Sequence, residues 1–379
     1  MKVAYIHVLP LELYPPARNL LELMSRRSGW KVRAWSTRNR RGEKDWAASD
    51  ISVTRHSYPG ERTPLPLRMP AYVGWHMRAA LDIARWKPDA LMAVEPHSAL
   101  AAWIYYRFLG GSSPLFVHHH EYYAPEDFGA PGMRLLRSTL GIERNDLFPR
   151  AAWVSQTNDE RLQLLRSWNS TIGKDAAHVL PNYPPREWIA KANATATAKA
   201  DSRTRMIYVG SASFDDTFIR EICTWVANQP EAVSLHVCGN NIRQDVWSWI
   251  HSLGAPNITT EPEGVAYEQL PVLLRRFDAG LVLYKGNTLN FVHNVPNKAI
   301  EYLACGLEVW YPRQMTGMQN FHLRHPDVRF QQVDFEKMPP MKRLLAPTAE
   351  TDREFPFTAE TATEPLLVRM EALAAAGDQ

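Results

Sequence analysis

Residues 295–309 read VPNKAIEYLACGLEV, and this stretch decides how the rest of the chain is interpreted. Pro296 suits the start of a helix because its backbone angle is already helical and the first turn needs no N–H from it. Gly306 suits the end of that helix, since glycine readily takes the left-handed conformation found there. An apolar run follows at once. The stretch therefore predicts a helix leading directly into a buried strand, which is the repeating unit of parallel sheets.

The same alternation of β-rich and amphipathic helical runs extends in both directions through the 379 residues. We expect helices from Ala17, at 216–228, at 267–276 and at 363–375. The expected strands are 3–8, 31–35, 51–56, 89–94, 115–119, 152–155 and 177–180, then 206–210, 233–238, 257–260, 279–284 and 308–311. This alternation predicts an α/β fold built on parallel sheets.

The length of the chain and one polar stretch predict two domains. Residues 190–204, AKANATATAKADSRT, are small and polar and fit a linker. We expect a first domain at 1–189 and a second domain at 205–345. A tail at 346–379 would end in a helix that packs back on the first domain. Ligands bind beyond the carboxyl ends of such strands, so the cleft between the two sheets is the expected site.

The composition is that of an ordinary globular protein, with 45% hydrophobic residues, 22% charged residues and a net charge of +3. No apolar run approaches the roughly 20 residues of a membrane span. The opening MKVAYIHV reads as a first strand rather than a secretion signal. Cys223, Cys238 and Cys305 lack metal-site spacing and fit a reduced cytosol. We expect a cytoplasmic protein.

Residues 26–41 contain seven basic residues and no acidic residue. On its own such a stretch is usually a solvated face, but it also suits anionic lipid headgroups. Trp30, Trp35, Trp46 and Trp75 favour the lipid interpretation, because tryptophan prefers the membrane interface. No nucleic-acid motif accompanies the basic residues. We therefore expect peripheral contact with an anionic membrane and no nucleic-acid partner.

The helix that begins at Pro296 has the features of a nucleotide-diphosphate site. Helix N-termini bind anions through exposed N–H groups and the positive end of the helix dipole. Asn297 and Lys298 lie in the first turn, where Lys298 would add a positive charge toward a diphosphate. Glu301 lies one turn later, where its carboxylate would accept hydrogen bonds from two ribose hydroxyls.

Residues 296–309 resemble the nucleotide-sugar signature of GT-B glycosyltransferases, particularly the bacterial group known as glycosyltransferase family four. The family pattern runs approximately Pro-x-Lys-x-x-Glu-Tyr-x-Ala-x-Gly-x-Pro-Val, and only Glu308 departs from it by replacing the last proline. Other segments resemble the family in the same order: 156–161 (QTNDER), 180–182 (LPN) and 277–284 (FDAGLVLY). The resemblance implies two Rossmann-like domains facing across a cleft, with 1–189 as the acceptor-side domain and 205–345 as the nucleotide-sugar-binding domain. It also implies a nucleotide-sugar donor, and neither a permanently bound cofactor nor a metal.

Two positions depart from the family. His293 stands where many retaining relatives have an acid that touches the transferred sugar, and histidine can donate or accept there. The Arg and Lys with which relatives clamp the diphosphate are absent from residues 210–216, GSASFDD. Backbone N–H groups of Gly210 and Ser211, with the Ser211 and Ser213 hydroxyls, would cradle the phosphate instead. These departures also suit a chain that binds a nucleotide sugar without turning it over.

A second candidate site is the run FVHHHEYY at 116–123, which closes an expected strand. Strand alternation puts His118 and His120 on one face and His119 on the other. Neighbouring residues on a strand cannot converge on one ion, which disfavours a metal site. The run resembles a His-x-His-Glu motif of related transferases. His118, His120 and Glu121, together with His293, are the catalytic candidates, and a structural histidine is the alternative for each histidine.

Weaker signals complete the donor site. Residues 263–267, EGVAY, fall where relatives hold the nucleotide base, so Tyr267 is a candidate, although a plain loop explains the segment almost as well. Asn290 is polar enough for sugar hydroxyls, but asparagine is also common in loops. Residues 95–97 close another strand and are a candidate to face the acceptor, although a turn is the preferred interpretation.

These features predict a hexosyltransferase-type enzyme that moves a sugar from a nucleoside-diphosphate sugar, UDP rather than GDP, to a hydroxyl. The expected acceptor is a glycan or lipid-linked intermediate of bacterial polysaccharide or glycoconjugate assembly, at the inner membrane face. The resemblance favours retention at the sugar carbon, whereas a basic role for Glu121 favours inversion. The alternatives are a sugar-nucleotide epimerase of the same architecture and a non-catalytic nucleotide-sugar-binding subunit. Neither a Gly-x-Ser-x-Gly elbow nor a Walker phosphate loop is present.

Overall fold

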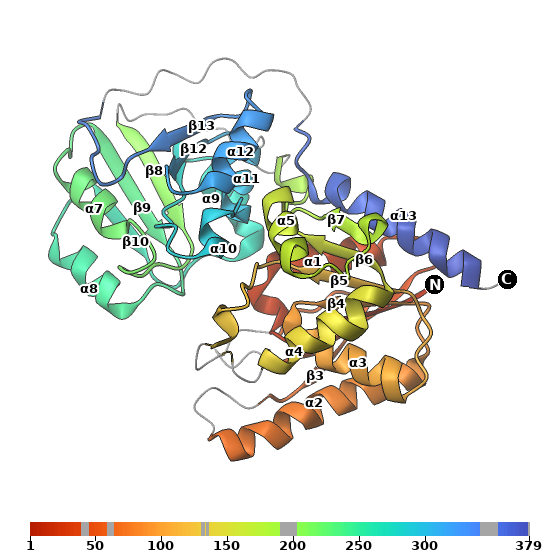
Figure 1. The fold of residues 1–379 in the computed structure, drawn as a ribbon. Coiled ribbons are helices and arrows are strands. Elements are labelled where there is room, and N and C mark those ends of the chain that lie inside the picture. Colours follow the sequence, from red (N-terminus) through yellow and green to blue (C-terminus); the bar gives the residue numbers. More distant parts are fainter. Residues whose placement is uncertain are drawn as a thin grey trace. The chain divides into compact units, whose positions relative to one another are not determined.

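The chain folds into two compact α/β units (Figure 1). A computed structural model describes residues 1–38, 45–58, 64–129, 133, 136–189, 203–341 and 355–377. Unit 1 comprises residues 1–182 and 359–379, and unit 2 comprises residues 183–358.

Unit 1 is built on a sheet of parallel strands whose spatial order is β3-β2-β1-β4-β5-β6-β7. The central strand β1 pairs with both β2 and β4, as in the match of Ala4 with Leu91. The strands are β1 (Lys2–His7), β2 (Lys31–Thr37), β3 (Ile51–His56), β4 (Ala90–Val94), β5 (Leu115–His119), β6 (Ala151–Gln156) and β7 (Ala177–Val179). The order reverses between β1 and β4, where open parallel sheets bind ligands beyond their carboxyl ends.

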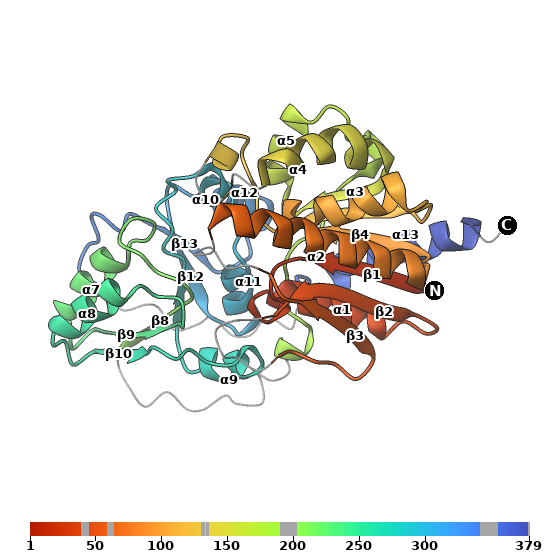
Figure 2. The same cartoon turned by 90° about the horizontal axis from the view of Figure 1, so that it is seen from below.

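Helices cover both faces of the unit 1 sheet, and each face has its own core. One core joins β1, β4 and β5 to α2 (Leu65–Trp86), α3 (Ala99–Phe108) and α5 (Asp159–Trp168). Figure 2 shows α2 as the long helix that runs along this sheet. The other core joins the strands to α1 (Pro15–Ser25) and α13 (Ala359–Gly377). Helix α4 (Arg137–Ile142) packs next to α3.

The C-terminal helix α13 is part of the unit 1 core rather than a loose tail. Leu366, Leu367 and Met370 are buried with residues of β1 and α1. Arg27 of α1 forms an ion pair with Glu364 of α13. Burial of three large apolar side chains is worth several kcal/mol, at roughly 1.5–3 kcal/mol each. This burial ties the end of the chain to its first domain.

Unit 2 repeats the design with the strand order β10-β9-β8-β11-β12-β13, all parallel. Numbered from its own first strand this is 3-2-1-4-5-6, the order of the Rossmann fold. The strands are β8 (Thr204–Val209), β9 (Val233–Cys238), β10 (Ile258–Glu261), β11 (Ala279–Leu281), β12 (Glu308–Pro312) and β13 (Phe330–Val333). The order reverses between β8 and β11.

The helices of unit 2 also divide between two faces. Helices α7 (Ile219–Ala227) and α8 (Gln244–Ser252) pack on one face. Helices α9 (Leu270–Leu274), α11 (Asn297–Ala304) and α12 (Thr316–Arg324) pack on the other. The short helix α10 (Leu289–Val292) lies between β11 and α11 in the chain.

The two units divide the chain earlier than the sequence suggested. The expected first domain ended at residue 189, but Tyr183 onward belongs to unit 2. The reason is Trp188, which is 1% exposed and packs in the core of unit 2. Of the expected linker 190–204, only residues 203 and 204 are described, and Thr204 already begins β8. Residues 346–354 of the expected tail lie outside the described residues.

The basic stretch at 26–41 is less available than its sequence suggests. Arg26 pairs with Glu22, and the guanidinium of Arg33 stacks on Trp35. Trp35 and Trp75, which we expected near a membrane, are 0% and 1% exposed and belong to the core. Packing inside unit 1 therefore explains these two tryptophans, and that part of the membrane expectation is wrong. Arg40 and Arg41 lie outside the described residues.

Three further features bear on the class of protein. Within the described ranges no helix is long and apolar enough to cross a membrane. Over the same part of the chain, no group of three or more His, Cys, Asp or Glu side chains is arranged to hold a metal ion. Cys223, Cys238 and Cys305 are all buried free thiols.

Candidate functional site

The helix predicted from residues 295–309 exists and faces the ligand-binding edge of unit 2. Helix α11 begins at Asn297, and no side chain caps its N-terminus at Pro296. Its end is followed by Gly306 with a φ of 80° and then by β12. The first turn therefore leaves backbone N–H groups for an anionic ligand.

Gly210 and Lys298 come together at the end of β8. Gly210 has a φ of 135°, which strongly favours glycine. A Cβ at this position would lie 2.5 Å from the Lys298 Nζ, so the ammonium group lies directly over the Gly210 Cα. A Cβ on Gly239, at the end of β9, would collide with the Gly210 carbonyl oxygen. Because neither glycine has a side chain, the ends of β8 and β9 approach each other closely and the Lys298 ammonium packs against the Gly210 turn.

The Lys298 ammonium is held in largely apolar surroundings. It lies 4.7 Å from the ring centroid of Tyr208 and 5.1 Å from that of Tyr284. Burial lowers the pKa of Lys298 to about 8, and the nearby Glu301 carboxylate opposes that shift. A weakly hydrated cation of this kind gains more from an incoming phosphate than an exposed lysine would.

Glu301 lies one turn further along α11, close to Lys298. Burial raises the pKa of Glu301 to about 7, against the opposing effects of Lys298 and a hydrogen bond with Tyr267. The ring of Tyr267 packs 4.7 Å from that of Trp188. The structure therefore brings Gly210, Lys298, Glu301 and Tyr267 into one cluster.

Tyr302 fixes α11 against the end of β8. Its hydroxyl accepts a hydrogen bond from the Val209 N–H at 3.0 Å, and the side chain is 1% exposed. A Cβ on Gly280 of β11 would enter the Tyr302 ring, so only glycine fits beneath it. Tyr302 belongs to the motif at 296–309, but the motif does not indicate that it positions α11; that role comes from the structure.

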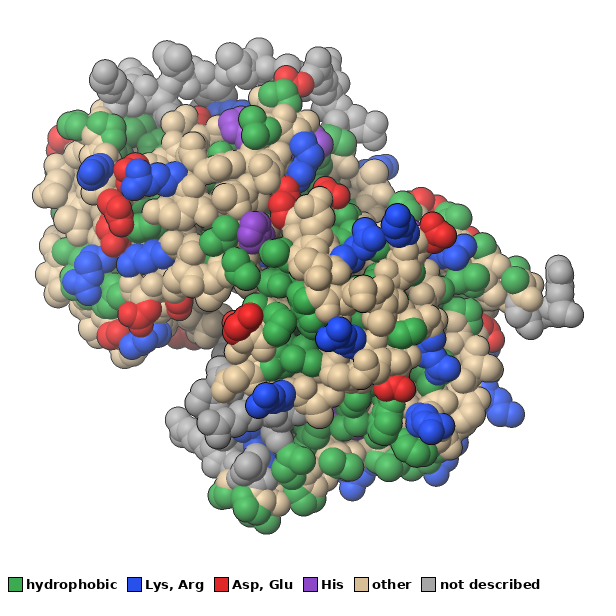
Figure 3. All heavy atoms as spheres, in the orientation of Figure 1, with side chains coloured by type: hydrophobic (Ala, Val, Ile, Leu, Met, Phe, Trp, Pro, Cys, Tyr) green, Lys and Arg blue, Asp and Glu red, His purple; other side chains and the backbone are tan. Residues whose placement is uncertain are grey.

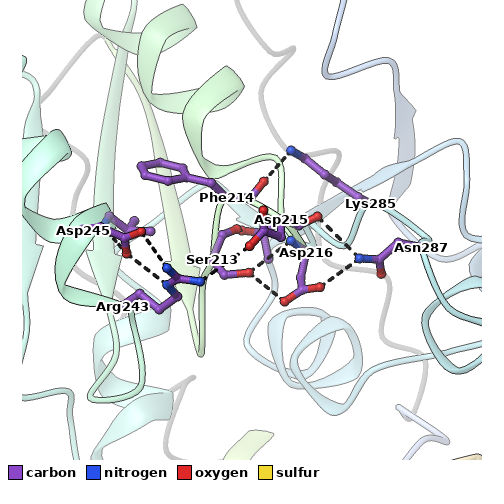
Figure 4. Close-up of polar contacts among 10 residues, drawn as sticks. Ser213, Phe214, Asp215, Asp216, Arg243, Asp245, Lys285 and Asn287 are labelled. Atoms are coloured by element: carbon purple, nitrogen blue, oxygen red, sulfur yellow. Dashed lines mark hydrogen bonds and ion pairs between the residues drawn. The ribbon is translucent and has the colours of Figure 1, made fainter. Parts of the chain in front are cut away.

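The turn after β8 does not use its two serines in the same way. Figure 4 shows Ser213 turned toward Asp216, to which its hydroxyl donates at 2.7 Å. The same oxygen accepts from the Asp216 N–H at 3.1 Å. The Ser213 hydroxyl is thus bonded within the turn, and its contact with a phosphate stays a prediction. The backbone oxygen of Ser211 accepts from the Tyr208 hydroxyl.

Asp216 links this turn to the loop after β11. Its carboxylate accepts from the Asn287 amide at 2.8 Å, and this bond, with the Ser213 hydroxyl, lowers the pKa of Asp216. Lys285 donates to the Phe214 carbonyl at 2.7 Å and forms an ion pair with Glu221. Figure 4 shows the Asp216–Asn287 and Lys285–Phe214 bonds joining the two loops. The network fixes one segment of the candidate site against the other.

Asn290 and His293 lie just after that loop. Asn290 is in α10, whose neighbouring Phe291 stacks on Tyr284 at 4.6 Å. His293 follows α10, with its Nδ1 3.4 Å from the Thr316 hydroxyl at the start of α12. Tyr284 faces Lys298, so Phe291 of α10 is separated from the cluster by one aromatic ring.

The histidine run of unit 1 has the predicted alternation. His118 Nε2 lies 3.1 Å from His120 Nδ1, and His118 Nδ1 lies 2.9 Å from the Ser155 hydroxyl. His120 Nδ1 also lies 2.9 Å from Asn182 Oδ1. Burial lowers the pKa of both histidines, in the case of His120 to about 4. Both rings are therefore neutral at pH 7.

His119 points the other way and is structural. Its Nε2 lies 2.8 Å from Glu143 Oε1, and both side chains are 3% exposed. This carboxylate raises the pKa of His119 against the effect of burial. The opposite orientation of His119 confirms the face assignment made from strand alternation.

Glu95, where a turn was the preferred interpretation, contacts the backbone of the histidine run in unit 1. It follows β4 at the point where the strand order reverses, and it is 2% exposed. Its Oε1 accepts from the N–H groups of His120 and Glu121 at 2.7 and 3.2 Å. Burial raises the pKa of Glu95 to about 7. Only the position of Glu95 at a strand end hinted at this role.

Arg161 supports the same segment from α5. It is 1% exposed and donates to the His120 carbonyl and the Thr157 hydroxyl, both at 3.0 Å. A third bond, of 3.3 Å, reaches Glu121 Oε2. The Glu121 side chain is 47% exposed, so one buried cation orients a carboxylate that faces solvent.

His7, at the end of β1, lies beside His120 at the carboxyl edge of the unit 1 sheet. Its ring centroid lies 6.2 Å from that of His120 and 4.7 Å from that of Tyr14. His7 Nδ1 lies 2.7 Å from the Leu9 carbonyl, which requires a proton on Nδ1. Within the described residues, the buried Nε2 atoms of His7 and His120 have no hydrogen-bond partner. Two buried acceptor positions at the switch point are typical of a polar-ligand site.

Comparison with solved structures bears on the fold. The chain is similar over 100% of its length to sucrose-phosphate synthase from Thermosynechococcus elongatus, with a TM-score of 0.64, 16% identity and 98% of that chain covered. It is likewise similar to alpha,alpha-trehalose 6-phosphate synthase from Burkholderia multivorans (TM-score 0.66, 11% identity, 100% and 97% covered). A third similar structure is HepE from Anabaena in complex with UDP and glucose (0.62, 12%, 100% and 98%).

These neighbours are GT-B glycosyltransferases, and the chain has the GT-B fold of two parallel-sheet α/β domains. At such identities the likeness establishes the fold alone. No protein-family model matches the sequence, and no curated protein matches it closely enough to count as a relative.

Proposed function

We propose that this chain is a glycosyltransferase that takes a sugar from a nucleoside-diphosphate sugar bound on unit 2. One observation carries the proposal. The N-terminus of α11, the Gly210 turn, the Lys298 ammonium and the Glu301 carboxylate meet at the carboxyl edge of one Rossmann-type sheet. The helix N-terminus, the glycine turn and the ammonium suit a diphosphate, and the carboxylate one turn later suits the hydroxyls of a ribose.

In the proposed reaction the bond between the sugar carbon and the diphosphate oxygen breaks, and a bond to the acceptor oxygen forms. Negative charge grows on the diphosphate as it leaves. The α11 N-terminus and Lys298 would stabilise that charge, since preorganised donors act strongly in a water-poor site. Glu301 would hold the ribose. We propose UDP as the nucleotide, because the similar HepE structure was solved with UDP.

Unit 1 would bind the acceptor hydroxyl. His120 has a pKa of about 4, so it is a weak base but a good hydrogen-bond acceptor at pH 7. Asn182 and His118 both lie at its Nδ1, which favours a proton there and leaves Nε2 to orient the hydroxyl. Glu121, held by Arg161, would take the hydroxyl proton. This arrangement favours inversion at the sugar carbon.

We propose a glycan or a lipid-linked intermediate as the acceptor and the cytoplasm as the compartment. His293, Asn290 and Asn297 are proposed to contact the transferred sugar, and Ser211 the phosphate. No permanently bound cofactor takes part in this scheme. The leaving diphosphate is met by side chains and backbone, so the scheme also includes no metal step.

The experiment is a measurement of UDP release from UDP-sugars, with and without pools of glycan or lipid-linked acceptors. Release that depends on an acceptor and disappears in Lys298→Met supports transfer. Conversion of one UDP-sugar to another without release would identify an epimerase. UDP binding without turnover in any pool would identify a non-catalytic binding subunit, and either outcome would overturn the proposal.

A further inference from the structure

Helix α2 exposes a cluster of apolar side chains. Among the described residues, ten large hydrophobic side chains have at least 36% of their surface exposed, and four of these lie on α2. They are Leu67, Met69, Val73 and Met77, with exposed fractions of 67%, 42%, 42% and 41%. Scattered apolar residues are normal on a protein surface, but four on one helix mark a contact surface.

These side chains form a continuous stripe. Met69, Val73 and Met77 are spaced four residues apart and so lie in one row along the helix. Pro66 and Pro70, both exposed, fall in the same row, and Leu67 lies beside it. We call this set the α2 stripe. The opposite side of α2 is buried in the core of unit 1 through Trp75, Ala79 and Ile83.

The charged residues along residues 64–81, which carry the α2 stripe, are basic. Residues 64–81 contain Arg68 and Arg78 but neither Asp nor Glu. The first acid is Asp82, which lies 3.5 Å from Arg85 and 3.6 Å from His56. Figure 3 shows hydrophobic and basic side chains along the lower edge of this view, where Figure 1 has α2. An apolar row beside arginines without acids complements a negatively charged apolar surface.

The buried side of α2, opposite the α2 stripe, packs toward the histidine site of unit 1. Tyr72 of α2 packs with Phe128 and Leu136, which follow β5 in the chain. His76 of α2 is close enough to His97 for their charges to interact, and the His97 ring lies 6.2 Å from that of Tyr123. Tyr123 in turn hydrogen-bonds Glu95. The helix that carries the α2 stripe is therefore also part of the packing around the proposed acceptor site.

We propose that the α2 stripe docks unit 1 on an anionic lipid bilayer. Leu67, Val73 and the methionines would enter the headgroup–acyl boundary, and Arg78 would lie among the lipid phosphates. This inference stands on the surface of unit 1 and needs no nucleotide. It assigns membrane contact to α2 rather than to residues 26–41, where Arg26 and Arg27 already pair with Glu22 and Glu364.

The test is co-sedimentation of the full chain with vesicles of phosphatidylcholine alone and of equal parts phosphatidylcholine and phosphatidylglycerol. We expect binding only to the mixed vesicles, and about tenfold or greater weakening in Val73→Glu/Met77→Glu. The matched control is Val368→Glu on α13, because Val368 is a helical valine of unit 1 that is 50% exposed. It should bind as the native chain does. Neutralising Arg26, Arg27 and Lys31 together should also change little.

Three results would overturn the proposal: no binding of the native chain to mixed vesicles, equal weakening in Val368→Glu, or a native dimer that Met77→Glu dissociates. The dimer would make the α2 stripe an interface between copies. Thermal melting checks that each variant folds, and Leu67→Ser/Met69→Ser replaces the double glutamate variant if that one does not. UDP titration of the same variants separates this proposal from the proposed donor site, because the α2 variants should bind UDP normally.

Discussion

Glu95 carries two unusual properties in one residue. Its φ of 65° is rare for a residue with a Cβ and costs of order 1–3 kcal/mol, and its carboxyl group is buried. Such strain persists where the surroundings hold it, and here the N–H groups of His120 and Glu121 do so. We interpret Glu95 as the residue that positions the backbone of the proposed acceptor site.

The raised pKa of Glu95 makes a prediction about stability. Its pKa is about 7 in the folded chain against 4.5 for the ordinary group, so the folded state holds the proton more tightly. The resulting stabilisation is present below pH 4.5 and is lost as the pH rises through 7. Glu95→Gln removes this pH dependence. The unfolding free energy of the variant minus that of the native chain should therefore rise by about 2–3 kcal/mol when the pH is raised from 5 to 8. Urea unfolding at both pH values measures it, and a difference that does not change with pH would refute the titration.

Lys298 and Glu301 predict a pH window for nucleotide binding. Glu301 with a pKa of about 7 loses its charge as the pH falls, and Lys298 with a pKa of about 8 loses its charge as the pH rises. Affinity for UDP should therefore be highest between about pH 7 and 8. In Glu301→Gln the affinity for UDP should no longer fall on the acid side, apart from the effect of the titration of UDP itself. In Lys298→Met the affinity should no longer fall on the alkaline side. Calorimetry from pH 6 to 9 tests this, and an unchanged profile in both variants would contradict it.

Sequence reasoning reached some site residues and missed others for a physical reason. The positions of Lys298 and Glu301 could be predicted once the start of their helix was recognised, because the sequence spacing of residues on a helix determines which of them are neighbours. Glu95 and Arg161 act on residues 25 to 41 positions away, through bonds that only the fold creates. The Ser213 hydroxyl bonds Asp216 within the same turn, a local competition for the hydroxyl that composition does not reveal.

At the scale of elements, one hydroxyl couples α11 to β8. The Val209 N–H has Tyr302 as its acceptor, and loss of a partner for a buried donor costs about 1–3 kcal/mol. We predict that Tyr302→Phe destabilises unit 2 by that amount and weakens UDP binding, since α11 is no longer held at the β8 turn. Denaturant unfolding together with UDP titration measures both effects. Tyr311→Phe, a buried tyrosine of β12, serves as a control that should bind UDP normally.

Most strands were predictable because apolar β-rich runs are a local signal, and the exceptions show where that signal fails. Strand β13 reads FQQV, and as an edge strand with two exposed glutamines it carries no alternation of its own. Helix α2 was missed because prolines at 64, 66 and 70 look like a loop, yet Pro66 falls in its first turn. The strand expected at 279–284 ends at Leu281, and the next residues instead lead to a bridge between Tyr284 and Thr217.

At the scale of the whole molecule, buried neutral histidines concentrate in unit 1. Burial lowers the pKa of His7 and His76 to about 3 and that of His97 and His120 to about 4. A folded pKa below the unfolded value means that the unfolded chain takes up more protons in acid. Stability from these groups is therefore present above pH 6.5 and is lost as the pH falls toward 4. Unit 1 should be the acid-labile part of the chain.

His76 offers the cleanest test of that expectation. Within the described part of the chain neither of its ring nitrogens has a hydrogen-bond partner, and the ring is 0% exposed. Between pH 7 and 5 the native chain should lose about 2 kcal/mol through this residue alone. His76→Leu should not lose this stability between pH 7 and 5. Hydrogen exchange of unit 1 amides at both pH values measures the difference. Equal loss of protection in the variant and the native chain would show that His76 does not contribute.

The central claim is that unit 2 holds a nucleoside diphosphate at α11, and its most direct test is a calorimetric titration with UDP and GDP. The native chain and Glu301→Ala are compared, with Glu231→Ala as control, because Glu231 is an exposed residue at the amino end of β9, on the opposite edge of the sheet. We predict micromolar binding of UDP, weaker binding of GDP, loss of UDP binding in Glu301→Ala, and native binding in Glu231→Ala. Absence of binding of either nucleotide by the native chain, or binding that survives in Glu301→Ala, would contradict the account.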